Sequence, residues 1–576
     1  MRSQEIELSD LVQKYNSVYK EKHNKNVVDL FDKLVKDSNI NIEENIQENK
    51  LLLEEKEKLA SYESSVKSYK FLVFFLLVIP FISLVILLVY TTVAVIAISV
   101  SIILISLGII IFVNFKINQL KSQILNFQKA VEKKENELIK KMAPLSKLLE
   151  PKMANQLFSK TFEIVHFDDY FSNKKMSLLV NKYNFQSQNY DNNTSIQKVY
   201  SGEILGNPFF IVQELNHELG TKVYKGTKTI RYRTKDNTTH TQTLVATLKK
   251  PCPFYKSDKT LIFASEAAPN LSFSRYASNM HLKNQWQVEK IIKSSTKNLS
   301  KLEKENSGFT FLGNNDFEVL FNALNRDNEK EYRMLFTPLA QRQMQELILD
   351  NKVGYGDDFY FSKNKMINKI KASHMEDLNI DHRKDNYFHY SFEKIKSDFI
   401  NKNNDYFKHL YFSFAPLLSI PLYAQFKTQD YIYENNYDAN YSWYEHESLA
   451  NGMEVKLLKH EHSSTQNILK TKYISSENEY IDSFEVMAYG YKTVNRVDYV
   501  SVLAANGRFY SVPVKWVEYI PVSKKSIVEI LANSDDLKDS QDIKLLNWID
   551  QIKNPIANSK DKKIHVIDGF LYRVLK

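Results

Sequence analysis

Histidine and carboxylate side chains cluster in one stretch of the chain and are the first residues to consider for metal chemistry. His446 lies between two glutamates, and His460 and His462 follow within the next 16 residues. If residues 460–462 formed a strand, His460 and His462 would share one face, as two ligands of one ion must. Such H-x-H pairs occur by chance, and the chain has no H-E-x-x-H motif. We therefore predict no metal site and no cofactor, with His446, His460 and His462 as weak candidates.

Other familiar catalytic patterns are incomplete or missing. His374-Met375-Glu376 has the H-x-E spacing of zinc deaminases, but the cysteine ligands that this chemistry needs are absent. Cys252 is the one cysteine, which excludes an intrachain disulfide and a thiolate metal cluster built from one chain. The chain has no P-loop, dinucleotide-binding, G-x-S-x-G or kinase motif. The catalytic residues are thus unknown from sequence, and we expect a protein without catalytic activity.

A short basic strip is the sequence's candidate for a binding surface. Arg231, Arg233 and Lys235 alternate within a segment that reads as a strand, so they fall on one face of a sheet. This face could contact lipid headgroups or an acidic partner, and the alternative is an ordinary solvated sheet face. Aromatic residues are dense between Tyr387 and Tyr444, but no RNA-binding signature accompanies them. We assign them to core packing and expect no nucleic acid partner.

One long apolar stretch predicts that the chain is anchored in a membrane. Residues 71–115 contain no Asp, Glu, Lys, Arg or His. One span needs about 20 residues, so the stretch predicts two spans, Phe71–Tyr90 and Val93–Phe115, with Tyr90, Thr91 and Thr92 as the turn. We expect a tight transmembrane hairpin, kinked at Pro80.

Lysines predict the orientation of this hairpin. Four of them precede the first span within 15 residues, five follow the second within 19 residues, and the turn has none. The positive-inside rule then places both termini in the cytoplasm. The predicted localisation is the cell membrane, with most of the chain on the cytoplasmic side.

The segments that flank the hairpin read as long helices. After the second span, apolar residues recur with alternating spacings of three and four: Ile117, Leu120, Ile124, Phe127 and Val131. This is the pattern of a coiled coil, and Pro144 and Pro151 would end it. We predict an antiparallel stalk about 40 Å long, from about 25–30 residues at 1.5 Å each. The alternative is separate packing of each helix on the soluble domain. Two amphipathic stripes, 11–19 and 27–35, predict two short helices upstream.

The remaining chain reads as antiparallel sheet with helices between the strands. Residues 198–205 and 207–214 predict a hairpin around Gly206, and 228–235, 241–248 and 260–265 continue the series. Further on, the expected elements are a helix at 285–305, a strand at 316–321, a helix at 328–348 interrupted near Pro338, and a strand from 359. Near the C-terminus they are strands at 483–489, 497–503 and 508–514, a helix at 543–552 and a strand at 564–567.

The fold class that follows is α+β, with an N-terminal helical stalk, a two-helix transmembrane hairpin and a β-rich antiparallel cytoplasmic region. The expected domains are N-terminal helices (1–40), stalk helix 1 (41–70), the hairpin (71–115), stalk helix 2 (116–150), an α+β region (151–430) and a β-rich region (431–576). At 576 residues the chain has room for several domains. With only 13 glycines it is poorly suited to a Gly-rich phosphate loop.

Short motifs add a resemblance. Tyr200-Ser201-Gly202-Glu203-Ile204 leads into Asn207-Pro208-Phe209-Phe210, and Phe317-Glu318-Val319 precedes Leu335-Phe336-Thr337-Pro338. With the charged N-terminal segment and the adjacent spans, these motifs resemble an uncharacterised bacterial two-transmembrane family known as a domain of unknown function. The resemblance covers roughly residues 40–420. It implies topology and assigns no catalytic residue.

The function expected from these observations is a membrane-anchored, cytoplasmic-facing scaffold or interaction protein. Its partners would be the lipid bilayer and membrane or cytoplasmic proteins, and a homo-oligomer is compatible with the sequence. One alternative is a membrane-tethered, hydrolase-like enzyme whose site cannot be read from sequence. Another is an accessory subunit of a transport or secretion complex.

Overall fold

The computed structural model describes the chain apart from residues 1–9, 90–92, 151, 187–191, 234–237, 306–309, 311, 382–386, 426–441, 478–480, 532–563, 568–569 and 576. It combines helices with antiparallel sheets, which confirms the α+β class. The chain forms two compact units. We call residues 24–153 and 382–404 the helical unit, and the rest of the chain the sheet unit.

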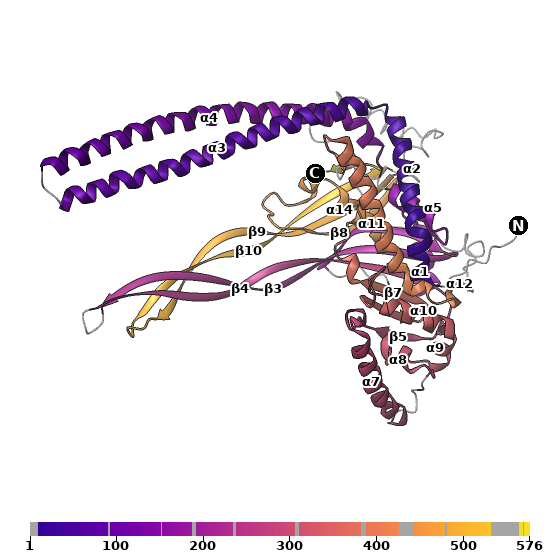
Figure 1. Ribbon diagram of the computed structural model, residues 1–576. Helices are drawn as coiled ribbons and strands as arrows, with labels where there is room; N and C mark the ends of the chain where they lie inside the picture. The colour runs from indigo at the N-terminus through magenta and orange to yellow at the C-terminus, as the bar shows by residue number, and fades with distance from the viewer. Residues whose placement is uncertain are drawn as a thin grey trace. The chain divides into compact units, whose positions relative to one another are not determined.

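The helical unit is built on two very long helices, α3 (Ile42–Val89) and α4 (Val93–Leu148). They lie side by side and antiparallel (Figure 1). Val66 of α3 packs with Val113 and Ile117 of α4, and the rings of Tyr62 and Phe127 lie 5.6 Å apart. Pro144 lies inside α4 rather than ending it, so the predicted stop at that residue was wrong.

Ion pairs also join the same two helices near the start of α3 and the end of α4. Lys141 of α4 lies 2.7 Å from Glu44 and 2.8 Å from Glu48 of α3. Lys56 pairs with Glu135, and Glu55 pairs with Lys134. Exposed pairs of this kind contribute little individually. Their cross-helix pattern, however, keeps α3 and α4 in one register.

The helical unit also contains a segment from much later in the chain. Asn45 donates from its side chain to the Tyr390 carbonyl (2.9 Å) and accepts from the Phe392 amide (3.0 Å). Phe31 is buried against the rings of Phe392 and Phe399. The base of the helical pair therefore includes residues more than 340 positions downstream.

One helical segment in the part of the chain with described side chains, Val100–Leu148, is long and apolar enough to cross a membrane by length and composition. The predicted turn, Tyr90 to Thr92, lies outside the described residues. Pro80 lies inside α3.

The sheet unit contains a seven-stranded antiparallel sheet in the order β1-β2-β3-β4-β7-β6-β5. Its strands are β1 (Val165–Phe167), β2 (Thr194–Ile204), β3 (Asn207–Arg233), β4 (Thr239–Ala264), β5 (Ser272–Arg275), β6 (Phe359–Asn364) and β7 (Ile367–Ala372). A two-residue turn joins β2 to β3, with positive φ at both Leu205 (50°) and Gly206 (84°). This is a type I′ turn, the preferred hairpin connection, so the predicted hairpin around Gly206 is confirmed.

A second sheet has the order β11-β12-β10-β9-β8. Its strands are β8 (Ile468–Glu477), β9 (Ile481–Leu503), β10 (Phe509–Leu531), β11 (Ile564–Ile567) and β12 (Phe570–Leu575). The Asn506-Gly507 pair lies in the β9–β10 connection, where Gly507 has φ of 76°. This turn confirms the hairpin predicted there. Strand β11 confirms the strand predicted at 564–567. The predicted helix at 543–552 lies outside the described residues.

The remaining described helices are shorter than α3 and α4, and several of them close the core of the first sheet. They are α1 (Leu11–Lys14), the π-helix η1 (Tyr15–Tyr19), α2 (Lys20–Ser38, shared with the helical unit), α5 (Met153–Thr161), α6 (Asn173–Asn181), the short η2 (Met280–Leu282), α7 (Gln285–Glu305), α8 (Asn315–Phe321), α9 (Glu329–Leu335), α10 (Pro338–Leu349), η3 (Ser373–Met375), α11 (Phe392–Leu418, also shared), α12 (Leu422–Gln425), α14 (Trp443–Gly452) and α15 (Val455–Leu458). Tyr406, Phe407, Tyr411 and Phe414 of α11 are buried in the core. The assignment of these aromatics to core packing is thus confirmed.

Three groups of predicted elements differ from the structure. Residues 316–321 form helix α8 rather than a strand, because Phe317, Leu320 and Phe321 are spaced to bury one helical face and Asn314 caps the N-terminus. The stripes at 11–19 and 27–35 belong to one nearly unbroken helical run from 11 to 38. The strands predicted at 228–235, 241–248 and 260–265 are parts of two strands, β3 and β4, which each exceed 25 residues.

Candidate functional site

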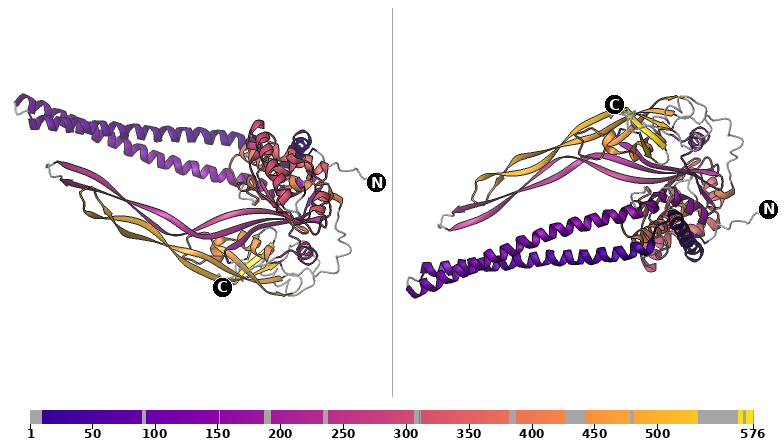
Figure 2. Two further views of the ribbon diagram at one scale, coloured as in Figure 1. Left: turned by 90° about the horizontal axis from the view of Figure 1, so that it is seen from below. Right: turned by 90° about the horizontal axis from the view of Figure 1, so that it is seen from above.

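The far halves of β3 and β4 extend beyond the sheet as a two-stranded arm, and β9 and β10 form a second arm beside it (Figures 1 and 2). We call residues 221–251 the first arm and residues 491–519 the second arm. Their facing sides share a small apolar core that contains Ile230, Leu244 and Ala246 of the first arm and Val512 and Val514 of the second. The two arms are therefore one packed, two-layer structure.

Close backbone contact fixes how the arms meet. A Cβ atom on Gly226 would lie 2.2 Å from the carbonyl oxygen of Pro513, so only glycine fits there. Lys250 of the first arm pairs with Asp498 of the second at 2.8 Å and lies over the ring of Trp516. Near the tips, the Ala505 amide donates to the side-chain oxygen of Gln242 at 3.0 Å.

The predicted basic strip lies near the tip of the first arm. Arg231 and Arg233 of β3 are exposed and lie opposite Thr241 and Thr239 of β4, while Tyr232 between them is on the other face and half-buried. The structure thus brings two of the three strip residues to one face. Lys235 lies outside the described residues.

The face that carries Arg231 and Arg233 is open along its whole length. Every residue on it is exposed: Thr221, Val223, Lys225, Thr227, Thr229, Arg231, Arg233, Thr239, Thr241, Thr243, Val245, Thr247, Lys249 and Pro251. This described face contains seven threonines and four basic residues and carries no carboxylate. Its hydroxyls and cations can donate hydrogen bonds to anionic groups.

Basic charge is concentrated on the arms. In sequence, the two arms contain twelve Lys and Arg against three Asp and Glu, while the whole chain has a net charge of +9. The excess on the arms equals the excess of the entire protein. Two of those acids already have cationic partners, since Asp498 is held by Lys250 and Glu518 by Arg496 at 2.8 Å. The arms therefore present a surface that attracts anions.

The structure does not assemble the three candidate metal ligands. His446 lies in helix α14, where its ring stacks on Phe484 with centroids 4.3 Å apart. His460 and His462 lie in a turn rather than on a strand, and the His462 amide donates to His460 Nδ1. Among the described residues, no group of three His, Cys, Asp or Glu is placed to hold a metal ion. The strand on which His460 and His462 would share a face does not form, because the chain turns there.

The glutamate next to His446 has a structural role instead. Glu447 is buried, pairs with Lys470 at 3.0 Å and accepts the Ile196 amide at 2.9 Å. Burial raises the pKa of Glu447, and the Lys470 ammonium opposes that rise. Lys470 also donates to the Thr194 carbonyl at 3.0 Å. This pair joins helix α14 and strand β8 to strand β2.

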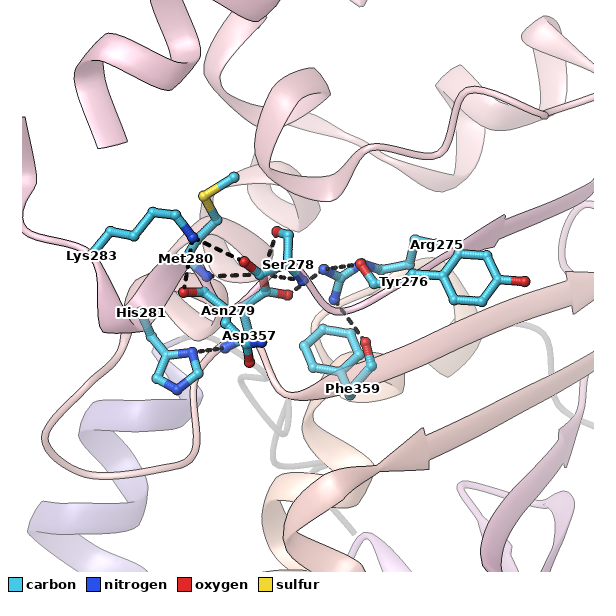
Figure 3. Close-up of polar contacts among 9 residues, drawn as sticks. All are labelled: Arg275, Tyr276, Ser278, Asn279, Met280, His281, Lys283, Asp357 and Phe359. Carbon is cyan, nitrogen blue, oxygen red and sulfur yellow. Dashed lines mark hydrogen bonds and ion pairs between the residues drawn. The ribbon is translucent and has the colours of Figure 1, made fainter. Parts of the chain in front are cut away.

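A second buried ion pair contains Asp357 (Figure 3). The residues around Asp357 form no recognisable sequence motif. Arg275 pairs with Asp357, and both side chains are fully buried. The other carboxylate oxygen accepts the Ser278 amide (2.9 Å), the Ser278 hydroxyl (2.6 Å) and the Met280 amide (3.1 Å). Asp357 is thus fully engaged within the protein. This cluster fixes the 275–283 loop and leaves the carboxylate no capacity for chemistry.

The neighbouring residue, Asp358, begins a chain of polar groups with the order of a catalytic triad. His374 Nδ1 lies 2.7 Å from Asp358, and His374 Nε2 lies 3.1 Å from the Ser413 hydroxyl oxygen. The Ser413 hydroxyl donates to the His409 carbonyl at 2.9 Å, and His374 Nε2 lies 3.0 Å from the same carbonyl oxygen. Because a carbonyl oxygen can only accept, this contact needs a hydrogen on Nε2, and Nε2 would have to lose that hydrogen before it could act as the base for Ser413. An Asp–His–Ser order can activate a serine nucleophile. Sequence reasoning missed this arrangement, because its members are far apart along the chain.

The surroundings of Ser413 restrict what it could do. Ser413 is buried and lies on a cavity with Lys259, Met375, Leu410 and Phe414 that has room for about one water molecule. Burial lowers the pKa of Lys259, which donates to the Glu376 carbonyl at 2.9 Å. An acyl substrate would need this cavity to open.

Comparison of this chain with protein-family models, with curated proteins and with solved structures finds no match.

Proposed function

We propose that this protein is a membrane-anchored scaffold without catalytic activity, whose arms present a basic surface to partners at the cytoplasmic face of the membrane. Two transmembrane helices, 71–90 and 93–115, would serve as the anchor. The scaffold would recruit membrane or cytoplasmic proteins. We also propose that the chain belongs to the two-transmembrane family that its short motifs resemble.

One observation supports the anchor above all others. Large apolar side chains are exposed along the outer surface of α3 and α4: Phe71, Phe74, Phe75, Leu77, Leu104, Ile105, Ile111, Phe112 and Phe115. A helical pair in water carries charged residues at such positions, and an apolar surface of this extent seeks lipid or a partner. No ionisable residue interrupts residues 71–115. A bilayer is the environment that suits this surface.

Alkaline carbonate extraction of membranes that contain the full chain tests the anchor. We expect the protein to stay in the membrane pellet. Ile79→Arg with Ile105→Arg should release it, since each arginine at a span centre disfavours insertion by about 2.5–3.5 kcal/mol. Leu125→Arg is the matched control, because Leu125 is exposed on α4 but lies outside the apolar stretch. Release of the unmodified protein by carbonate would refute the anchor.

Reporter fusions after Lys576 test the orientation. The positive-inside rule predicts a fluorescent cytoplasmic reporter and an inactive periplasmic phosphatase reporter. The reverse pattern would place the sheet unit outside the cytoplasm.

The Asp358–His374–Ser413 arrangement favours a second candidate, a membrane-tethered hydrolase. A fluorophosphonate probe that labels the native protein but not the Ser413→Ala variant would support it. The buried position of Ser413 favours the scaffold instead. For the scaffold we expect no labelling of Ser413.

A further inference from the structure

The second arm ends in exposed apolar side chains that the scaffold proposal does not use. Tyr499 and Leu503 of β9 and Phe509 of β10 lie on one face, and Leu503 pairs directly with Phe509 across the strands. Tyr499 and Phe509 are both 70% exposed. Val497 continues the row. We call these four residues the apolar tip.

The apolar tip is distinct from the core between the arms. Along the same strands, the alternate residues Val500, Val502, Val512 and Val514 point the other way and pack against the first arm. Side chains alternate between the two faces of a strand, so the apolar tip has no partner within the arm pair. Four large apolar residues on one exposed face form a patch rather than scattered single residues.

Basic residues lie at the same end of the arm pair as the apolar tip. Arg508 and Lys515 of the second arm are exposed beside it. The hydrogen bond from Ala505 to Gln242 brings the end of the second arm level with Ile230, which pairs with Gln242. Arg231 and Arg233 therefore lie at the same end of the arm pair, on its opposite outer face, where they add to the positive charge of that end. Aromatic residues next to arginine and lysine are the composition that suits the lipid–water interface.

We propose that the end of the arm pair binds the surface of an anionic phospholipid bilayer. The Tyr499 and Phe509 rings would enter the interface, and Arg508 and Lys515 beside them would contact phosphate groups. Charge favours this occupant, since the arms hold twelve basic residues against three acids and two of the acids are already paired. Lipid also fits because the cations are spread over an open face, whereas a specific acidic ligand would need convergent donors. This inference goes beyond the anchor, because it requires only that the arms meet a bilayer.

A depth-sensitive label on the full chain tests the proposal. Ser511→Cys places a thiol next to Phe509 on the tip face, and Ser523→Cys places one farther back on the same exposed side of β10. Cys252 is buried, and the labelled native protein gives the background. Each variant, carrying the fluorophore NBD, is reconstituted into vesicles with nitroxide-labelled lipid, so that quenching reports contact between label and bilayer.

We expect strong quenching at position 511 and little at 523 in phosphatidylcholine vesicles with about one-third phosphatidylserine, and a large loss in phosphatidylcholine alone or at high salt. Tyr499→Ser with Phe509→Ser should abolish the difference. Val223→Ser with Val245→Ser, two exposed apolar residues on the first arm, should not. Arg508→Glu should weaken the interaction about tenfold or more, since each basic residue near an anionic surface contributes about fivefold.

Several results would overturn the proposal. These are equal quenching at 511 and 523, equal quenching in neutral and anionic vesicles, or quenching that survives the Tyr499→Ser, Phe509→Ser change. If neither vesicle quenches the label but a co-purified protein shields it, the surface belongs to a protein partner. Carbonate extraction is independent of this test, because quenching at position 511 reports contact of the tip with lipid, whereas extraction reports retention by the apolar helices.

Discussion

The Nζ atom of Lys363 lies 2.9 Å from the carbonyl oxygen of Ala267, at a site where only 1% of the lysine is exposed. A second carbonyl, that of Lys365, also accepts from this nitrogen. Two carbonyl acceptors satisfy the two hydrogens of a neutral amine. Burial lowers the pKa of Lys363 from 10.5 to about 7.

The stability of the sheet unit should therefore depend on pH through this lysine. Between pH 7 and 10.5 the unfolded chain binds more protons than the folded one, so the free energy of unfolding should rise with pH across that window. Lys363→Met should remove this rise. Urea unfolding at a series of pH values, compared between the native protein and this variant, measures it. Lys371→Met, at an exposed position, is the control, and a pH-independent difference between native protein and Lys363→Met would contradict the prediction.

Arg326 should be essential for stability. It binds Glu318 through two nitrogens, at 2.7 and 3.0 Å, and both side chains are fully buried. Arg326→Met leaves the glutamate charge buried without its partner, which we expect to destabilise the protein by about 3–5 kcal/mol. Arg342→Met should cost less than about 1 kcal/mol, because Arg342 is exposed and its partner Glu346 is too. Denaturant midpoints measure both, and similar losses would contradict the assigned role.

The interface between α3 and α4 should control protease resistance without affecting insertion. Leu120 packs near Val66, and Phe127 packs near Tyr62. Leu120→Asp with Phe127→Asp should separate the helices and expose the segments on either side of the apolar stretch to trypsin. Retention of the protein in the membrane pellet after carbonate extraction should stay unchanged. Leu125→Asp is the control, since Leu125 faces solvent. Unchanged proteolysis of the double variant would count against a stalk.

Gly226 should hold the arms together. A valine there would overlap the Pro513 backbone, which cannot move without breaking the pairing of β10 with β9. Gly226→Val should increase hydrogen exchange along both arms, from 221 to 251 and from 491 to 519, while the core of the first sheet stays protected. Thr227→Val, on the exposed face, should leave exchange at the native level. Protection unchanged in Gly226→Val would show that the arms do not depend on this contact.

Sequence could predict the elements that local chemistry determines. Helix α7 matches the predicted 285–305 range because its apolar spacing is helical throughout. The hairpin turns at Gly206 and Gly507 have the positive φ that such turns need. Helix α8 was misread as a strand because a short apolar run has no distinctive period. The length of β3 and β4 was missed because their glycines and prolines look like breaks, whereas Gly226 allows the two arms to approach each other.

The polar sites were harder to predict than the elements. Arg231 and Arg233 alternate in sequence, so their shared face follows from strand geometry. Asp358, His374 and Ser413 meet only because the residue before strand β6, the short helix η3 after β7 and helix α11 pack together, and no local pattern records that packing. The histidines at 446, 460 and 462 are close in sequence but lie on a helix and in a turn, so proximity along the chain was misleading.

The two hydrogen bonds that Asn45 forms with Tyr390 and Phe392 determine how much of the chain must be made before the helical unit can finish folding. A ribosome that adds about 5–20 residues per second takes roughly 20–70 seconds to travel from the first of these residues to the last. Throughout that interval Phe31 lacks its aromatic neighbours, although the apolar helices have already emerged. A newborn chain must therefore keep the base of the helical pair open until about two-thirds of its length has been made, and a message cut short before codon 404 would leave that base unfinished.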